Sequence, residues 1–208
     1  MLVPALLQAF CMGIGHKKQF SFFKTDWQHF LCHGGSLRQK RKGRGMRPLS
    51  TKEPLHVVFK VNKSILRHKS LRSYSCFFLI NKLIEKYSQY FHVKIEQISI
   101  QADHVHLLLR TSRRSQFHNF FRVLSGQIAQ RFKKAGLLKN VTDTPNSHKV
   151  EQSLWKYRPF SRVIRGYKAY KTARNYIQLN EKEALQEIPY QKNRLRGLST
   201  SDWQILWS

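Results

Sequence analysis

The sequence predicts an α+β fold, in which a ferredoxin-like split β-α-β antiparallel sheet carries an added C-terminal helix. First, stretches of alternating apolar residues are interspersed with stretches whose apolar residues recur every three or four positions. Second, the order of these stretches is β-α-β-β-α-β-α, and its first six elements match the split β-α-β pattern. Third, the chain has 208 residues, of which 41% are hydrophobic and 12% aromatic, so a packed core is expected.

The first strand and the first helix are predicted between residues 56 and 91. Residues 56–61 alternate, with Val57, Phe59 and Val61 on one face of a strand. A helix is expected to begin near Leu71, because five residues then follow at helical spacing: Phe77, Ile80, Ile84, Tyr87 and Phe91.

A hairpin of two strands is predicted next. The apolar parity changes between residues 93–95 and residues 98–100, which indicates a β-bulge near residues 96–97 within one long strand. A tight turn at residues 102–103 then leads into a second strand over residues 104–110. The two strands are expected to pair with each other across this turn.

The remaining elements complete the fold. Helical spacing predicts a helix over residues 117–132, and a polar connection follows over residues 136–153. A short strand is predicted over residues 157–164, then a helix over residues 167–184. Since the split β-α-β arrangement places its two helices on one face of the sheet, the opposite face is expected to be free for a functional site.

Three zones are expected along the chain. Residues 1–54 form a basic, largely irregular leader, residues 55–184 form the regularly patterned domain, and residues 185–208 form a tail. In the tail, Trp203 and Trp207 lie four residues apart and are expected to dock a short helical turn onto the domain.

The charge of the chain indicates its class of partner. Lys and Arg number 38 and Asp and Glu number 11, so the formal net charge is +27. This surplus favours a polyanionic partner, with nucleic acid in first place and a membrane surface in second. The candidate phosphate contacts are Arg38, Lys40, Arg41, Lys42, Arg44 and Arg47 in the leader, and Arg113, Arg114, Arg131, Lys133 and Lys134 further on. For the leader, the alternative is a solvated flexible segment.

Cysteine usage and hydropathy bear on the compartment. Cys11, Cys32 and Cys76 form no CxxC pair and no disulfide framework, which indicates a reducing, cytoplasmic setting. Residues 1–12 are apolar but too few to span a bilayer, so no membrane anchoring is expected.

Two histidines stand out on the strand predicted over residues 104–110. His104, His106 and Leu108 share one face of this strand, and the opposite face carries Val105, Leu107 and Leu109. Residues at i and i+2 lie about 6–7 Å apart along a strand, so both imidazoles can reach one divalent cation. The alternative is a pair of half-exposed histidines on the solvent face of a sheet.

Tyr176 and Asn180 form the second candidate pair, at i and i+4 on one face of the last helix. A tyrosine hydroxyl titrates near ~10, so it becomes a good nucleophile only with help from a base or from charge neutralisation at the electrophile. A metal that polarises a phosphate gives this help, and an amide oxygen suits a hard cation. The alternative is that Tyr176 forms the edge of the apolar stripe of this helix.

Together these motifs resemble a known family. The carrying segments are DHVHLL at 103–108, W…FSRVI at 155–164 and YIQLN at 176–180. They resemble the single-tyrosine HUH transposases (His-hydrophobe-His), and in particular the branch of REP-associated tyrosine transposases. The leader over residues 33–58 is similar to leaders of that branch, so the resemblance covers residues 33–184.

The resemblance implies a chemistry and a role for each residue. His104 and His106 would bind Mg²⁺ or Mn²⁺, with Asn180 in the place of the third ligand. Tyr176 would attack a phosphodiester of single-stranded DNA at hairpin or palindromic ends, which gives a 5′-phosphotyrosine link and a free 3′-OH. Residues 55–184 would then be the catalytic domain, and the protein would be a nucleoid-associated monomer or homodimer.

Two other functions remain open at this point. One is a nucleic-acid-binding ferredoxin-like module without catalysis, although histidines stand where stacking aromatics would be expected. The other is a rolling-circle replication initiator or relaxase with the same HUH chemistry. The small size of the chain and its single tyrosine motif favour the transposase.

Acidic residues beside the motifs are expected to be structural. Asp103 is expected to shape the turn before the histidine strand, on the face away from the histidines. Glu181 and Glu183 are expected to be surface acids that balance Lys182 and Lys171.

Overall fold

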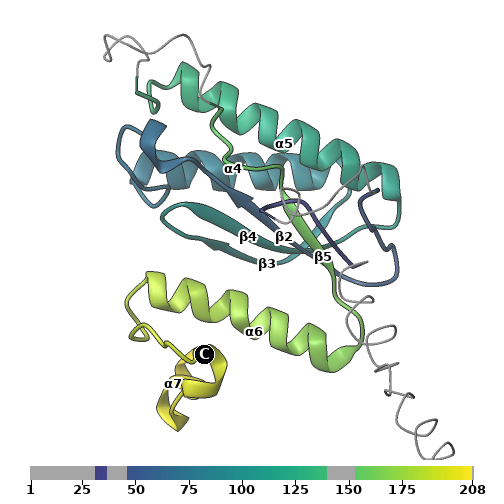
Figure 1. Cartoon of the computed structure of the whole chain (residues 1–208), viewed down its shortest axis with the longest axis vertical. Coiled ribbons are helices and arrows are strands. Elements are labelled where there is room, and N and C mark those ends of the chain that lie inside the picture. Colours follow the sequence, from purple (N-terminus) through teal and green to yellow (C-terminus); the bar gives the residue numbers. More distant parts are fainter. Residues whose placement is uncertain (1–30, 37–45, 140–152, 208) are drawn as a thin grey trace, which may run out of the picture.

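A computed structural model describes residues 31–36, 46–139 and 153–207 of the chain. Two helices cover one face of a five-stranded sheet, and a third long helix with the C-terminal segment lies on the other side (Figure 1). The strands are β1 (Cys32–His33), β2 (Leu55–Lys60), β3 (Lys94–Ile100), β4 (His104–Arg110) and β5 (Phe160–Val163). The helices are α4 (Tyr74–Tyr90), α5 (Arg114–Lys134), α6 (Tyr167–Ala184) and α7 (Thr200–Trp207), with the short 3₁₀ turns η1 (Lys63–Ile65) and η3 (Arg194–Gly197).

The sheet has the order β1-β5-β2-β4-β3, and all neighbouring strands are antiparallel. Strand β4 lies between β2 and β3, which α4 connects, and this insertion defines the split β-α-β arrangement. The predicted α+β, ferredoxin-like class is therefore confirmed. The register of β3 against β4 shifts between Ile95 and Gln97, so the predicted bulge is also present.

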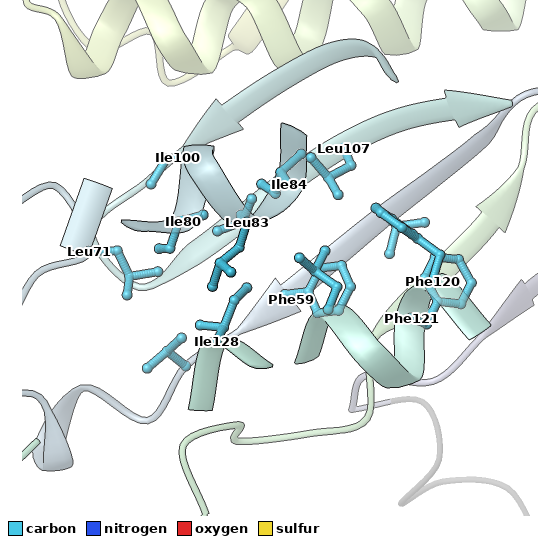
Figure 2. Packing of buried hydrophobic residues seen from close by; sticks show 14 of the residues in the cluster. Phe59, Leu71, Ile80, Leu83, Ile84, Ile100, Leu107, Phe120, Phe121 and Ile128 are labelled. Carbon is cyan, nitrogen blue, oxygen red and sulfur yellow. The ribbon is translucent and has the colours of Figure 1, made fainter. Parts of the chain in front are cut away.

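The main hydrophobic core lies between the sheet and helices α4 and α5. Figure 2 shows Phe59 of β2 and Leu107 of β4 in the same cluster as Ile84 of α4 and Phe120 of α5. All four side chains are almost fully buried. They come from the apolar faces that the periodicity indicated, and burial of one face fixes the register of each strand.

Helix α6 packs against β3 and β4 on the opposite face of the sheet. Its apolar stripe contributes Ile177 to a small cluster with Leu108 of β4 and Ile164, and Tyr170, Ala173 and Tyr176 pack around it. The expectation that this face is free is therefore wrong over β3 and β4. Helix α6 itself lies over the predicted residues, 167–184, but its packing against the sheet was not predicted.

The C-terminal segment folds back onto α6. Leu206 of α7 and Ile188 are buried against Leu179 of α6, and the rings of Trp203 and Trp207 stack with centroids 6.5 Å apart. The docking that the two tryptophans predicted is thus observed, and it involves a complete helix of eight residues.

The leader contributes a strand that the sequence analysis did not predict. Strand β1 pairs with β5 at the edge of the sheet. Gly34 directly follows it with a φ of +82°, and a Cβ atom at this position would lie 2.2 Å from the carbonyl oxygen of Pro159. Because only glycine fits this close approach, the chain can turn tightly against β5 here.

None of the helices in the described part of the chain combines the length and the apolar composition that a membrane span needs.

Candidate active site

The two histidines and the tyrosine singled out in the sequence lie together between β4 and α6. The ring centroids of His104 and His106 are 4.6 Å apart, and that of Tyr176 lies 5.7 Å from His106, with the two rings nearly perpendicular. His106 is 5% exposed, because α6 covers it. The alternative of two half-exposed histidines on an open sheet face is therefore excluded for His106.

Strand pairing and helix packing hold these groups in place. His106 is opposite Val58 of β2 and Ser99 of β3, so β4 is hydrogen-bonded on both sides at this point. Tyr176 is positioned by the neighbouring Ile177, which is fully buried in the cluster under α6. The side chains thus come from a central strand and from a helix with a fixed apolar face.

Asp103 interacts directly with the first histidine. Nδ1 of His104 and Oδ1 of Asp103 are 2.6 Å apart, and Nζ of Lys60 lies 3.7 Å from Oδ2 of Asp103. Burial opposes ionisation of this carboxyl, but the hydrogen bond from His104 and the nearby cations outweigh it and lower the pKa of Asp103. An Nδ1–H that donates to a carboxylate leaves Nε2 of His104 with its lone pair.

The expectation for Asp103 is therefore only half right. Asp103 does lie in the turn, which a hydrogen bond of 2.8 Å from the amide of Gln101 to the oxygen of His104 closes. The backbone oxygen of Asp103 accepts a hydrogen bond of 2.8 Å from the amide of Val61, which extends the pairing of β4 with β2. Its side chain, however, orients His104, and the sequence analysis assigned it away from the histidines.

A third histidine, His56 of β2, supports the second one. Nε2 of His56 and Nδ1 of His106 share a hydrogen bond of 3.0 Å, and their rings stack with centroids 5.2 Å apart. His56 was not predicted as a site residue, because β2 has no second histidine two residues away that would form a pair with it. Its position on the face of β2 opposite to Val57 was the available signal.

Burial keeps both of these imidazoles neutral. Desolvation and the charge of Arg162 lower the pKa of His56 to about 4. Desolvation, followed by the charges of His56, His104 and Arg194, lowers the pKa of His106 to about 2. A neutral imidazole is the form that coordinates metal ions.

The free nitrogen atoms of the histidine pair fit a cation. Nε2 of His106 is buried and has no hydrogen-bond partner, which is unusual for a polar atom inside a protein. Within the described residues, no group of three or more His, Cys, Asp or Glu side chains could hold a metal ion. Among the described residues, the side chains left as a further ligand are therefore amides and hydroxyls, and solvent and substrate oxygens are the other sources.

Asn180 lies one turn after Tyr176, but its side chain is already engaged. Its Oδ1 accepts a hydrogen bond from Nη2 of Arg194, and its Nδ2 is buried without a partner. Its backbone oxygen accepts a hydrogen bond of 2.7 Å from Gln101. The structure thus brings Asn180 near the tyrosine, with its amide oxygen turned to an arginine.

Arg194 of η3 closes the site from the C-terminal side. Its guanidinium lies 5.2 Å from the centroid of the Tyr176 ring and forms an ion pair of 2.8 Å with Glu183. Glu181 in turn pairs with Arg72 at 3.1 Å. The two glutamates are therefore half-buried partners of arginines, and their assignment as surface acids that balance lysines is wrong.

A cavity of about 720 Å³ adjoins these groups. Its lining includes His56 and Arg162 from β2 and β5, Tyr176 from α6, and residues 193–196 from the C-terminal segment. The site is thus a cleft between the sheet, α6 and η3.

The basic residues named from the sequence lie elsewhere. Helix α5 covers the other face of the sheet (Figure 1). Its basic candidates are exposed, as is Arg113 directly before it: Arg114, Arg131, Lys133 and Lys134. Arg47 is half-buried, and its guanidinium donates to Oγ of Ser161 at 2.6 Å and to the oxygen of Pro159 at 2.9 Å. The other leader candidates, Arg38, Lys40, Arg41, Lys42 and Arg44, lie outside the described residues.

The chain is similar to known proteins in sequence and in fold. Residues 52–180 match the family model described as "Transposase IS200 like". No match is found among the curated proteins. Two solved structures are similar to the chain at less than 25% identity, and the first of them shows a similarity of fold alone.

One similar structure is a REP-associated tyrosine transposase bound to a REP hairpin, with a TM-score of 0.52 and 14% identity over 72% of this chain and 81% of that one. Another is a crystal structure of a putative transposase from Deinococcus radiodurans R1. Its TM-score is 0.39, with 18% identity over 68% of this chain and 98% of that one.

Proposed function

Because the chain belongs to the family of IS200-like transposases, we propose that it cleaves and rejoins single-stranded DNA through a covalent bond to Tyr176. The observation that carries this proposal is the packing of the Tyr176 ring against His106, beside His104. Tyr176 also lines the cavity, as does His56, the hydrogen-bond partner of His106. A hydroxyl group and two imidazoles with available nitrogens therefore lie together beside this cavity. This is the set of groups that tyrosine attack on a phosphodiester needs.

The reaction conserves the number of phosphoester bonds. Oη of Tyr176 loses its proton and forms a bond to phosphorus, while the bond from phosphorus to O3′ breaks and O3′ takes up a proton. The products are a DNA 5′-phosphotyrosine and a free 3′-OH. Attack of a 3′-OH on the phosphotyrosine reverses these changes, so strands can be rejoined without an external energy source.

His104 and His106 are proposed to hold Mg²⁺ or Mn²⁺ through their Nε2 atoms, and Mn²⁺ tolerates imidazole ligands better than Mg²⁺ does. The amide oxygen of Asn180 is the candidate third ligand once Arg194 releases it. When bound, such a cation supplies positive charge that polarises the scissile phosphate. Asp103 and His56 orient the two imidazoles through hydrogen bonds to their Nδ1 atoms.

The proposed substrate is single-stranded DNA next to a hairpin. The solved transposase of similar fold is bound to a REP hairpin, which supports this substrate class. The net charge of +27 supports binding to a polyanion independently of any relative.

The test is an assay for the covalent adduct. The full-length protein is incubated with labelled single-stranded hairpin DNA and Mn²⁺, and a denaturing gel then separates the protein–DNA species. Tyr176→Phe should abolish the adduct, because a ring without oxygen cannot form the ester. Tyr170→Phe is the matched control, since Tyr170 lies on the same helix in the apolar cluster. An adduct that persists in Tyr176→Phe and disappears in Tyr170→Phe would overturn the assignment.

A further inference from the structure

We propose that the cavity beside Tyr176 is a binding pocket for one nucleobase of the single-stranded DNA, next to the phosphate that is cleaved. This inference rests on the proposed function and adds a subsite to it. The pocket would make the enzyme sensitive to the presence of a base at one position of its substrate.

The sheet provides a floor for such a pocket. Helix α6 packs against β3 and β4, and beside it Phe160 and Arg162 of β5 and His56 of β2 line the cavity. Its volume of about 720 Å³ lies within the range of about 300–1,000 Å³ that is usual for ligand pockets. A nucleotide therefore fits without a rearrangement of the sheet.

The cavity borders the proposed chemistry directly. Two of its lining residues, Tyr176 and His56, are the proposed nucleophile and the hydrogen-bond partner of His106. A DNA strand whose phosphate lies at the Tyr176 hydroxyl must place an adjacent nucleotide at the mouth of this cavity. Its occupant is thus a neighbour of the scissile phosphate.

The side chains around the cavity suit a nucleotide. Phe160 is half-buried on the floor and offers an aromatic ring, on which a base of any sequence can stack. Arg162 and Arg196 are exposed, and neither takes part in an ion pair of the described residues. None of the described lining residues is acidic, so an anionic backbone meets no like charge there.

The position of Phe160 is defined by its neighbours. Gly35, after β1, approaches it so closely that a Cβ atom there would lie 3.2 Å from Cβ of Phe160. The amide of Gly35 donates a hydrogen bond of 2.9 Å to the oxygen of Arg158. This packing holds the ring for stacking before DNA arrives, which limits the entropy lost on binding.

The experiment combines protein variants with altered DNA. Binding of hairpin DNA with a single-stranded flank is measured by fluorescence anisotropy in EDTA, while an abasic nucleotide is moved along the flank. With the unmodified protein, one abasic position should weaken binding about tenfold. Phe160→Ala should weaken binding to intact DNA by a similar factor, and the abasic nucleotide at that position should then have no further effect.

Two variants and one control make the result interpretable. Phe160→Leu keeps apolar volume, so it should fold with an unchanged melting temperature and still lose the sensitivity to the abasic position. Phe160→Trp should retain that sensitivity. Tyr74→Ala removes an aromatic side chain that is 84% exposed on α4, on the other side of the sheet, and should change nothing.

The outcomes separate this inference from the proposed function. If the loss of affinity caused by Phe160→Ala adds to the loss caused by the abasic nucleotide at every position, the pocket is overturned. This holds even when the Tyr176 adduct forms normally. Coupled reductions without a Tyr176 adduct would leave the pocket as a DNA-binding site and overturn the proposed catalysis.

Discussion

Each histidine of β4 has one ring nitrogen held by a neighbouring side chain. Nδ1 of His104 contacts Asp103, and Nδ1 of His106 contacts His56. Both Nε2 atoms are therefore available to one ligand on the same face of the sheet. Such outer partners fix the tautomer and the orientation of a ligating imidazole. The two proposed histidine ligands therefore each have an orienting partner, and neither partner was recognised from the sequence.

Removal of His106 should eliminate the divalent-dependent reaction. We expect His106→Ala to lose Mn²⁺ binding, measured by electron paramagnetic resonance, and adduct formation, while its binding to hairpin DNA stays close to that of the unmodified protein. His118→Ala is the control, since His118 is exposed on α5. Normal adduct formation by His106→Ala would contradict the assignment of the site.

Removal of His56 should have an intermediate effect. Loss of an outer partner typically reduces metal affinity about 10–100-fold, and we expect a reduction of this size for His56→Ala in Mn²⁺ titrations. His56→Gln keeps a polar group on the strand and should recover part of the affinity. His68→Ala, at an exposed position after η1, serves as the control. An unchanged Mn²⁺ affinity in His56→Ala would show that His106 needs no such support.

At the scale of elements, periodicity predicted the strands and helices of the main core. The alternation in β2 and β4 and the bulge in β3 follow from local patterns, because one face of each strand is buried against α4 and α5. Strand β1 was not predictable, since two residues carry no periodicity and their pairing with β5 is a long-range contact. The packing of α6 over the histidines is also a long-range contact, so it was not predicted either.

The turn after β1 should be sensitive to any side chain. We expect Gly34→Ala to lower the free energy of unfolding by about 1–3 kcal/mol from backbone strain alone, because a φ of +82° is unfavourable for alanine. The collision of its Cβ with the Pro159 carbonyl adds to this loss. Gly126 is the matched control: it lies within α5, and a Cβ atom there meets nothing within 4 Å. Gly126→Ala should stabilise the helix by about 0.5–1 kcal/mol.

Thermal unfolding followed by circular dichroism checks both substitutions. The melting temperature should fall for Gly34→Ala and rise slightly for Gly126→Ala. Equal melting temperatures for the two variants would mean that the β1 turn contributes nothing to stability.

At the scale of the whole molecule, cations lie on both sides of the sheet. Arg162 and Arg196 line the cleft, whereas Arg131, Lys133 and Lys134 are exposed on α5 behind it. Charge composition predicted a nucleic-acid partner, but it could not distinguish these two surfaces. Only the fold shows which cations adjoin the tyrosine.

The surface on α5 should therefore affect affinity and leave the chemistry intact. We expect replacement of Arg131, Lys133 and Lys134 by Gln to reduce the slope of log K against log salt by about 0.7–0.9 for each phosphate that the variant no longer neutralises. At saturating DNA the yield of the Tyr176 adduct should not change. A salt slope equal to that of the unmodified protein would show that α5 does not bind the DNA.

The histidines and the tyrosine of the candidate site were visible in the sequence because each pair has a regular spacing on one element. His56, Arg162 and Arg194 were not, since they come from two other strands and from the C-terminal segment. Their approach to Tyr176 depends on the sheet order and on the return of the chain over α6. Proximity of this kind is set by tertiary structure.

The alternation along β4 also limits how the length of this region can change. His104 and His106 alternate with Val105 and Leu107, which belong to the main core. The turn before β4 is closed by a hydrogen bond of 2.8 Å from the amide of Gln101 to the oxygen of His104. Deletion of one residue between Gln101 and His104 would shift the strand by one step and point the imidazoles into the apolar core. Insertions and deletions of single residues should therefore be far more harmful here than most substitutions in the same turn.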